Sequence, residues 1–413
     1  MKLAKSSGSE HQARIDLVTN APSIADHFGH STKGSEISTL RVGGDCPDFQ
    51  VARNRLELME LVRADLRTDH QFRDRSAVCI GGGSNLLISD EGFKGLLVQF
   101  RDDGATAIID RKSGVVRANA AMPWDRLVEE VVEAGLQGLE CISGVPGTVG
   151  GAVVQNAGAY GQEIADCIRH VELLDTIKGE YTGLARRRLK FGYRTSSLKK
   201  TKPPRFIVVG VTLQLSVNPS FYPAHGEVLA DLRSSLGSGP YSLERIRASI
   251  LRIRASKGML VSTQLEPSAG SFFVNPHLDK SEYHKLQQSH PQLSHVPSTD
   301  MRKRGRLRAY NVPGYRLAAA AMIEMAGFPR GYRLGNAAVS SRHALALVNS
   351  GDAKADEIAT LALQIQFAVR EMFGITLVPE PVLLGFEKGR LLGDRNSIPQ
   401  FLRSFREDSV GDE

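Results

Sequence analysis

The sequence predicts an α+β fold built from three units. It has 413 residues, of which 41% are hydrophobic and 23% charged, and this is enough for two or three domains with substantial cores. Short β-branched and apolar runs alternate with a few helical patterns. Two glycine-rich segments, residues 81–83 and 138–161, interrupt these runs, and core packing alone does not explain them.

The first unit is expected over residues 37–100, after a polar leader, residues 1–36, that we expect to be mobile. One helix is predicted at residues 55–66, where apolar residues recur on one face. Strands are predicted at residues 77–80 and 96–100, on either side of the first glycine turn.

The second unit is expected over residues 101–240. Pro123 opens a predicted helix that Gly135 ends, directly before the long glycine segment. Strands are predicted at residues 105–110, 115–118, 168–175 and 206–215. Apolar residues alternate along the last of these strands, so one face is expected to be buried.

The third unit is expected over residues 241–362, with one helix ending before Gly258 and an alanine-rich helix at residues 316–325. A long helix is predicted at residues 355–373, ended by Gly374. Its apolar stripe consists of Ile358, Leu361, Ala362, Ile365, Val369 and Met372. Beyond it, strands are predicted at residues 375–377 and 382–385, and a polar tail at residues 389–413.

Charge and cysteine content limit the partners and the cellular compartment that we expect for this chain. The net charge is +7, and basic clusters lie at residues 186–190, 199–205 and 302–308 without the interleaved aromatic residues that stack on bases. The four cysteines form no C-x-x-C pair, and the histidines show no metal-ligand spacing. The N-terminal residues 1–16 lack the apolar segment typical of a signal peptide, and no apolar run approaches the roughly 18 residues of a membrane span. We therefore expect a cytoplasmic monomer without a metal, a nucleic-acid partner or a membrane partner.

The turn Gly81-Gly82-Gly83-Ser84-Asn85 follows a short apolar run directly. Successive N–H groups in such a turn form an anion nest that suits a pyrophosphate. The spacing matches neither G-x-G-x-x-G nor G-x-x-x-x-G-K-[ST], so the Rossmann and P-loop interpretations both fail. A dinucleotide bound in another way stays open.

Five motifs then carry a resemblance to a known family. GGGSNLLI, GLECISGVPGTVGGAVVQNAGAYG, FGYRTSSLK, SAGSFFVNP and LVPEPVLLG occur in the order seen in the UDP-N-acetylenolpyruvoylglucosamine reductases, and the resemblance runs from about Leu40 to Gly385. That family has the FAD-binding fold of the vanillyl-alcohol oxidase type.

The resemblance implies a three-unit flavoprotein. Residues 37–100, joined by residues 363–388, and residues 101–240 would form a two-part non-Rossmann FAD-binding module, and residues 241–362 a C-terminal substrate-binding domain. The chain would be an FAD-dependent NADPH oxidoreductase. It would reduce UDP-N-acetylglucosamine enolpyruvate, a UDP-sugar enolpyruvyl ether, to UDP-N-acetylmuramate in peptidoglycan synthesis, using FAD and NADPH.

The resemblance also implies roles for single residues. Ser271 would be the general acid, Arg194 would hold the substrate carboxylate, and Glu380 would act with Arg194 to stabilise the intermediate. Tyr193, Lys257 and Asn275 would bind substrate. The FAD-binding residues would be Gly81, Gly82, Gly83, Ser84, Asn85, Gly144, Pro146, Gly147, Thr148, Gly150, Gly151, Asn156, Gly158, Ala159 and Tyr160.

One position departs from the family pattern. Members of that family have a tyrosine that closes over the substrate diphosphate, and at the aligned position this chain has His225. This favours a second hypothesis, a related FAD reductase that acts on a different enolpyruvyl nucleotide; alternatively, His225 lies on a solvated loop and contacts nothing. A third hypothesis, a non-catalytic anion or nucleic-acid binder, has only the basic clusters as its support.

Overall fold

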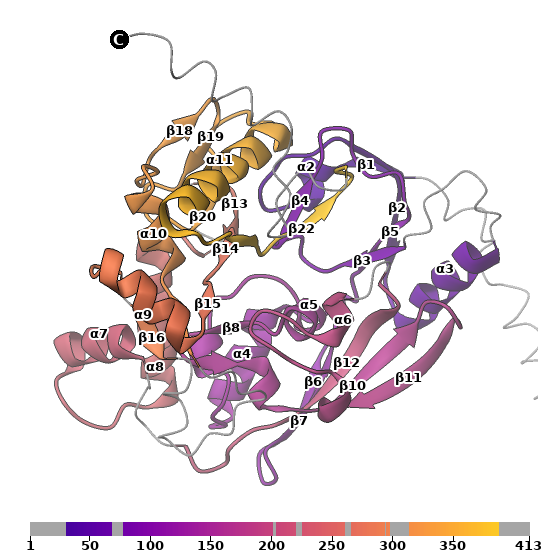
Figure 1. Ribbon diagram of the computed structural model, residues 1–413. Helices are drawn as coiled ribbons and strands as arrows, with labels where there is room; N and C mark the ends of the chain where they lie inside the picture. Colours follow the sequence, from indigo (N-terminus) through magenta and orange to yellow (C-terminus); the bar gives the residue numbers. More distant parts are fainter. Residues whose placement is uncertain are drawn as a thin grey trace, which may run out of the picture.

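The computed structural model describes residues 30–67, 77–200, 204–219, 225–260, 266–293, 295–297 and 314–387. It shows three packed parts (Figure 1): a five-stranded sheet with its helices at the bottom, a small sheet at the upper right, and a helix-covered sheet at the upper left. Residues 1–29 of the expected leader, the tail from residue 389 and the basic cluster at residues 302–308 lie outside the described residues. The prediction of a mobile leader is wrong for residues 30–36, which form a strand and most of a short helix.

The first part is a small sheet with strand order β1-β2-β5-β3, in which β2, β5 and β3 run parallel. Its elements are β1 (His30–Lys33), α2 (Gly34–Ile37), β2 (Asp45–Ala52), α3 (Arg55–Arg67), β3 (Val78–Ile80), β4 (Leu86–Ile88) and β5 (Leu97–Phe100). Strand β22 (Val382–Leu384), near the end of the described chain, pairs in parallel with β4. The end of the segment 363–388 thus returns to this part, as expected, whereas residues 363–379 pack or pair with the third part.

The second part is an antiparallel sheet with strand order β11-β10-β12-β7-β6. Its elements are β6 (Ala107–Asp110), β7 (Val115–Asn119), α4 (Trp124–Glu133), η2 (Glu140–Ile142), α5 (Val149–Gln155), β8 (Gly158–Ala159), β9 (Gln162–Glu163), η3 (Ile164–Asp166), β10 (Ile168–Asp175), β11 (Glu180–Ala185), η4 (Arg186–Arg188), α6 (Ser197–Lys200) and β12 (Phe206–Gln214). The predicted alternation of β12 is wrong: residues 207–211 are all buried. A central strand in the core of this part has no solvated face.

Two helices, α7 (Gly226–Leu236) and α8 (Leu243–Ser256), pack together through a small core of their own. Val228 and Leu232 from α7 meet Ile246 and Ile250 from α8 in this core. The pair spans residue 240, where we expected the second unit to end.

The third part carries the sheet β13-β20-β19-β18, the pair β14-β21 and the sheet β15-β17-β16. Its elements are β13 (Ser268–Ser271), β14 (Phe273–Val274), β15 (His277–Leu278), α9 (Lys280–Ser289), β16 (His295–Pro297), β17 (Tyr315–Leu317), α10 (Ala319–Met325), β18 (Arg333–Leu334), β19 (Ala337–Val339), β20 (Ala346–Asn349), α11 (Ala355–Phe373) and β21 (Val378–Pro379). Helix α11 has the bounds that its apolar period predicted, with Gly374 in the left-handed conformation beyond its end.

Three details of the third part differ from prediction. Residues 315–317 form a strand rather than a helix, so α10 begins only at Ala319. The N–H of Ala319 donates a hydrogen bond to the side-chain oxygen of Asn275 at 3.0 Å. Residues 375–377 form no strand, because the carbonyl of Leu377 accepts the Gln366 amide at 2.7 Å instead of a strand partner. Met372 is 44% exposed and leaves the buried stripe of α11.

Within the described ranges, no helix combines the length and the hydropathy that crossing a membrane requires.

Candidate active site

Glu380 lies where segments from all three parts of the fold meet. Its carboxylate accepts the Gln155 side-chain amide at 3.0 Å and lies 3.3 Å from Nε of Arg194. Its backbone carbonyl accepts Nζ of Lys199 at 3.2 Å and the Asn85 amide at 3.3 Å. Both glycine-rich segments and the FGYRTSSLK motif therefore converge on this one residue.

The backbone of Glu380 is held from several sides. Pro379 and Pro381 restrict it on both sides in sequence. Its N–H donates to the carbonyl of Phe272 at 2.8 Å, and two residues later the N–H of Val382 donates to the carbonyl of Asn85 at 2.9 Å. The glutamate is consequently a fixed, mostly buried carboxylate, with 16% of its side chain exposed.

Arg194 adopts the left-handed conformation, with φ at +54°. It lies in a tight turn in which the backbones of Gly192 and Thr195 exchange hydrogen bonds of 2.9 and 3.1 Å. Its guanidinium donates to the carbonyl of Gly158 while Nε faces Glu380. A non-glycine residue in this region of φ costs roughly 1–3 kcal/mol, and such strain is concentrated at functional sites.

Ser271 ends β13 next to the residue that anchors Glu380. Gly270 before it has φ at +72°, and a Cβ there would meet no atom within 4 Å, so open space adjoins the strand at this point. Phe272 after it is fully buried, and so is Phe273, within the core of the third part. These rings anchor the strand and leave the half-buried Ser271 at its edge.

The two glycine segments face one another across a narrow gap. A Cβ on Gly81 would lie 2.4 Å from Oγ1 of Thr148, and a Cβ on Gly82 would lie 3.3 Å from Cα of Gly147. A Cβ on Gly147 would in turn lie 3.0 Å from Oγ of Ser84. Two side-chain-free backbones in such close approach form a cradle whose N–H groups fit the pyrophosphate of a dinucleotide.

The first turn of α4 holds the long glycine segment in place. The Trp124 backbone N–H donates to the carbonyl of Gly147 and its indole N–H to the carbonyl of Ile142, both at 3.0 Å. The Asp125 carboxylate accepts the N–H of Gly144 at 2.6 Å. The cradle is therefore positioned by a buried aromatic anchor and one carboxylate.

Some residues predicted to bind FAD also pack against other parts of the fold. A Cβ on Gly144 would meet Arg254, and one on Gly150 would meet Ala120 at 3.1 Å. Asn156 is fully buried, and its side-chain amide donates to the carbonyl of Gly192 at 2.8 Å. Asn156 thus supports the turn that carries Arg194. The remaining predicted residues of the segment, Pro146, Gly151 and Ala159, lie in or beside α5 and β8.

A second cluster of polar residues lies at the end of α8. Lys257 pairs with Glu227 at 2.6 Å and lies 5.9 Å from the centre of the Tyr160 ring. The Tyr160 ring contacts the His225 ring edge to face at 5.2 Å between centres. Tyr160, which we expected to bind FAD, therefore lies beside His225 and Lys257, two residues that we expected to bind substrate.

His225 does not lie on an isolated solvated loop. It is half-buried against Tyr160, and among the described residues Nδ1 is buried without a hydrogen-bond partner. Burial lowers the pKa of His225, although Glu227 opposes that shift.

Arg254 is a site residue that the sequence analysis missed. It is 7% exposed, and within the described chain its buried Nε has no hydrogen-bond partner. Burial lowers the pKa of its guanidinium. The signal in the sequence was its place three residues before Lys257 on the last turn of α8, which puts both cations on one face. Gln155 and Lys199 were also missed.

His343 faces the same cluster from the third part of the fold, and burial, helped by Lys257 and Arg254, lowers its pKa to about 4. Its Nδ1 accepts the N–H of Leu345 at 3.2 Å. An unfolded histidine takes up a proton near pH 6.5, so the unfolded state binds more protons between about pH 6.5 and pH 4. The free energy of unfolding therefore falls as the pH falls through this window.

We expect this loss to be roughly 3 kcal/mol, from a pKa difference of about 2.5. Urea unfolding at pH 7 and pH 4 measures it, with His343→Gln as the variant that lacks the titrating group. The variant should lose less stability than the parent chain by that amount. Equal losses would show that His343 titrates normally.

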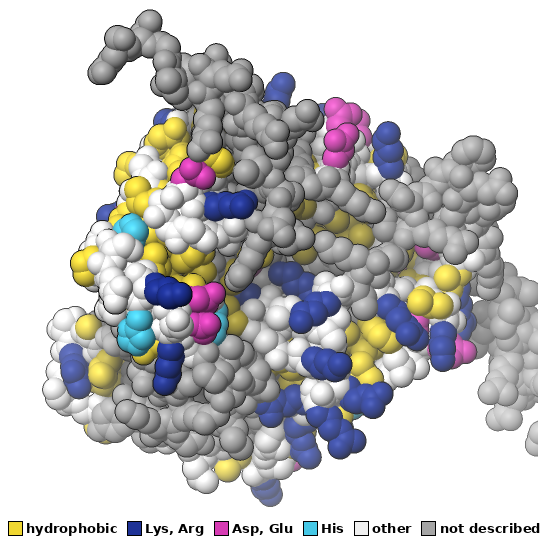
Figure 2. All heavy atoms as spheres, in the orientation of Figure 1, with side chains coloured by type: hydrophobic (Ala, Val, Ile, Leu, Met, Phe, Trp, Pro, Cys, Tyr) yellow, Lys and Arg dark blue, Asp and Glu magenta, His cyan; other side chains and the backbone are white. Residues whose placement is uncertain are grey.

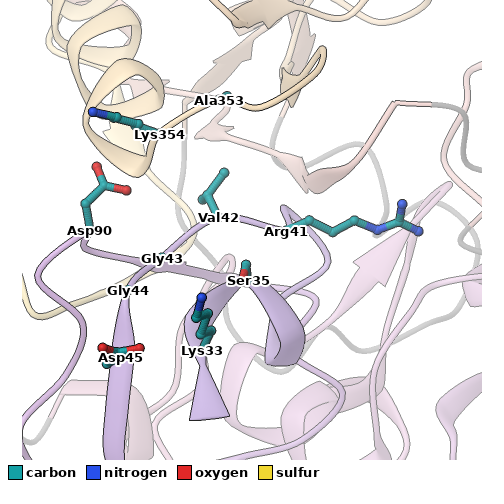
Figure 3. Close-up of a pocket in the computed structure, with 10 residues that line it drawn as sticks. All are labelled: Lys33, Ser35, Arg41, Val42, Gly43, Gly44, Asp45, Asp90, Ala353 and Lys354. Atoms are coloured by element: carbon teal, nitrogen blue, oxygen red, sulfur yellow. The ribbon is translucent and has the colours of Figure 1, made fainter.

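A hollow of about 370 Å³ lies elsewhere, where the first part meets the start of α11 (Figure 3). Lys33, Arg41, Asp90 and Lys354 are among the residues that line it. The Asp90 carboxylate accepts the first two N–H groups of α11, each at 2.9 Å, and so caps that helix. None of the predicted site residues lines this hollow, which lies at the boundary between the first and third parts of the fold.

Two family models match segments of this chain. Residues 67–184 match the model of an FAD binding domain, and residues 262–384 match that of the UDP-N-acetylenolpyruvoylglucosamine reductase C-terminal domain. A UDP-N-acetylenolpyruvoylglucosamine reductase of Mycobacterium tuberculosis is 36% identical over 87% of this chain and 96% of its own length. That of Salinispora arenicola is 34% identical over 85% of this chain and 94% of its own length.

A solved structure shares the fold. The crystal structure of UDP-N-acetylenolpyruvylglucosamine reductase from Thermus caldophilus matches with a TM-score of 0.57 and 26% sequence identity, covering 87% of this chain and 99% of that one. In this chain the segment that matches the FAD binding domain precedes the one that matches the C-terminal domain. This chain therefore belongs to the UDP-N-acetylenolpyruvoylglucosamine reductase family.

Proposed function

We propose that this chain reduces the enolpyruvyl group of UDP-N-acetylglucosamine enolpyruvate to give UDP-N-acetylmuramate, at the expense of NADPH, in peptidoglycan synthesis. Its family membership makes it an FAD-dependent oxidoreductase. The observation that carries the proposal is the convergence of Arg194, Glu380 and the Ser271 strand beside the glycine cradle. Because all of these groups come from one chain, we propose a monomer as the working form.

The cradle residues Gly81, Gly82 and Gly147 would hold the FAD pyrophosphate through their backbone N–H groups. Bound FAD would supply hydride transfer from NADPH to the terminal carbon of the enolpyruvyl double bond. The protein would supply orientation, charge stabilisation and the proton.

Arg194 and Glu380 would act on the substrate carboxylate as one unit. The guanidinium can bind an incoming carboxylate bidentately, and Glu380 fixes its orientation. As hydride reaches the terminal carbon, negative charge develops on the carbon next to the carboxylate and is shared with it as an enolate. Ser271 would then donate its hydroxyl proton to that carbon, which saturates the former double bond.

The cluster at the end of α8 would hold the diphosphate of the UDP-sugar. Lys257, His225 and the missed Arg254 would bring donors or positive charge to it. Exposed lysine and arginine side chains gather on the lower part of the face in Figure 2, near the five-stranded sheet, and raise the local concentration of anionic ligands. Asn275 supports the start of α10 with its side-chain oxygen, and its amide would face the substrate.

Turnover with a matched pair of ligands tests the proposal. The holoenzyme should consume NADPH when UDP-N-acetylglucosamine enolpyruvate is added, and the product should gain two hydrogen atoms. UDP-N-acetylglucosamine, which lacks the double bond, should stimulate no consumption. A chain that ignores the first compound but reduces another enolpyruvyl nucleotide would support the second hypothesis, which His225 alone favours.

The pH dependence of UDP-sugar binding tests His225. A protonated imidazole makes a stronger hydrogen bond to a diphosphate than a neutral one, so bound anion raises the pKa of the histidine. Since burial lowers that pKa in the free protein, affinity should keep rising as the pH falls below about 6.5. Calorimetric titration from pH 8 to pH 5.5 should show the rise in the parent and not in His225→Tyr. Identical profiles would place His225 outside the diphosphate site.

A further inference from the structure

Arg316 reaches from the third part of the fold to the FGYRTSSLK motif of the second part. Its guanidinium carbon lies 3.6 Å from the centre of the Tyr193 ring, within the range of a cation–π contact. The guanidinium carbon of Arg194 lies 4.8 Å from the centre of the same ring. One aromatic ring is therefore in contact with two cations from different parts of the chain.

The contact with the Tyr193 ring is the main interaction of the Arg316 guanidinium among the described residues. Within the described part of the chain, Arg316 has no carboxylate partner, and its buried Nε has no hydrogen-bond partner. Burying part of a charged guanidinium costs free energy unless another group compensates it. The cation–π contact with the Tyr193 ring is therefore the main attraction that stabilises the Arg316 side chain in this place. The side chain is half-buried, which strengthens that attraction relative to an exposed pair.

The backbone of Arg316 is tied to the strand that continues from the proposed general acid. Arg316 in β17 pairs with His277 in β15, and the N–H of Leu317 donates to the carbonyl of Pro276 at 3.0 Å. Residues 271–278 run without a break from Ser271 to this pairing. The backbone around Arg316 is therefore bonded to the segment that follows the acid along the chain.

Tyr193 in turn precedes Arg194, whose left-handed backbone needs support from its surroundings. We infer that Arg316 is a positioning residue for Arg194, acting through the Tyr193 ring, and that it sets the carboxylate-binding guanidinium in register with the Ser271 strand. This inference rests on the proposed function, in which Arg194 binds the substrate carboxylate.

Binding to the oxidised holoenzyme tests the inference, with two ligands that differ at the carboxylate. Arg316→Met should weaken UDP-N-acetylglucosamine enolpyruvate about 5- to 30-fold, the range of a partly buried cation–π contact. It should leave the affinity for UDP-N-acetylglucosamine unchanged. Arg316→Lys, which keeps a cation over the ring, should recover most of the loss. Arg330→Met, which removes an exposed arginine of the same part, should change neither affinity.

A double-mutant cycle separates positioning from direct contact. Tyr193→Leu should weaken the enolpyruvyl ligand at least as much as Arg316→Met, because it also removes the ring beside Arg194, and adding Arg316→Met to Tyr193→Leu should weaken binding no further. If the two losses multiply, Arg316 contacts the ligand itself and the inference is overturned. Equal losses for both ligands would overturn it as well, because they would indicate general damage to the fold.

The proposed carboxylate site can be judged separately. Arg194→Met should weaken the enolpyruvyl ligand selectively. If it weakens both ligands equally, the proposed role of Arg194 fails, and the inference fails with it. If Arg194→Met is selective and Arg316→Met is silent, only the inference fails. Thermal unfolding and the flavin absorbance of each variant confirm that it is folded and loaded.

Discussion

Ser271→Ala should leave the reduction of the flavin by NADPH nearly intact while slowing its reoxidation by UDP-N-acetylglucosamine enolpyruvate about 10²- to 10⁴-fold, the usual effect of a positioned proton donor. The structure supports this separation because Ser271 ends the strand that leads into Phe272, whose carbonyl holds Glu380, whereas the cradle is made by the backbones of Gly81, Gly82 and Gly147. Rapid mixing of each half-reaction measures the two rates independently.

Ser268→Ala is the matched control, since it removes a hydroxyl from the same strand. Ser268 is buried, and its oxygen accepts the N–H of Gly270 at 3.3 Å, so its loss should lower stability without a selective effect on reoxidation. Equal slowing of both half-reactions in Ser271→Ala would contradict the role of general acid.

Arg194→Lys should lower turnover about 10²-fold or more, as expected when a developing anion loses its fixed donor. The planar guanidinium donates to the carbonyl of Gly158 and faces Glu380 at the same time. A lysine places one nitrogen at the end of a flexible stem and cannot reproduce this geometry. Steady-state kinetics on the enolpyruvyl substrate check the expected result.

Arg187→Lys is the control for this change, because Arg187 is an exposed cation in the preceding η4 turn. It should have full activity. If Arg194→Lys were equally active, Arg194 would be an ordinary surface cation and its contact with Glu380 would have no catalytic meaning.

The fold could be predicted well where local periodicity decides the structure. The apolar period of residues 355–373 and the following Gly374 predicted α11 with its observed bounds. The apolar pattern failed to predict the structure where a residue from another segment is the hydrogen-bond partner. The carbonyl of Leu377 accepts a hydrogen bond from the Gln366 amide, so no strand forms there. Tyr315 and Arg316 pair with β15 before α10 begins. No local signal in either segment identifies those partners.

The site shows the same limit. Ser271, Arg194 and Glu380 were predicted from the family resemblance, because a serine after glycine or a glutamate between prolines has many ordinary structural roles. Gln155 and Lys199 contact Glu380 from far along the sequence, so only the fold could reveal them. Tyr160 was assigned to FAD by its place in the glycine segment, yet its side chain lies against His225.

A single turnover tests the central claim most directly. The holoenzyme is reduced with NADPH without oxygen and then mixed with UDP-N-acetylglucosamine enolpyruvate, while the visible absorbance of the oxidised flavin is followed. The account predicts that this absorbance returns in one step with the enolpyruvyl compound and stays low with UDP-N-acetylglucosamine. Flavin that stays reduced in the presence of the enolpyruvyl compound would contradict it.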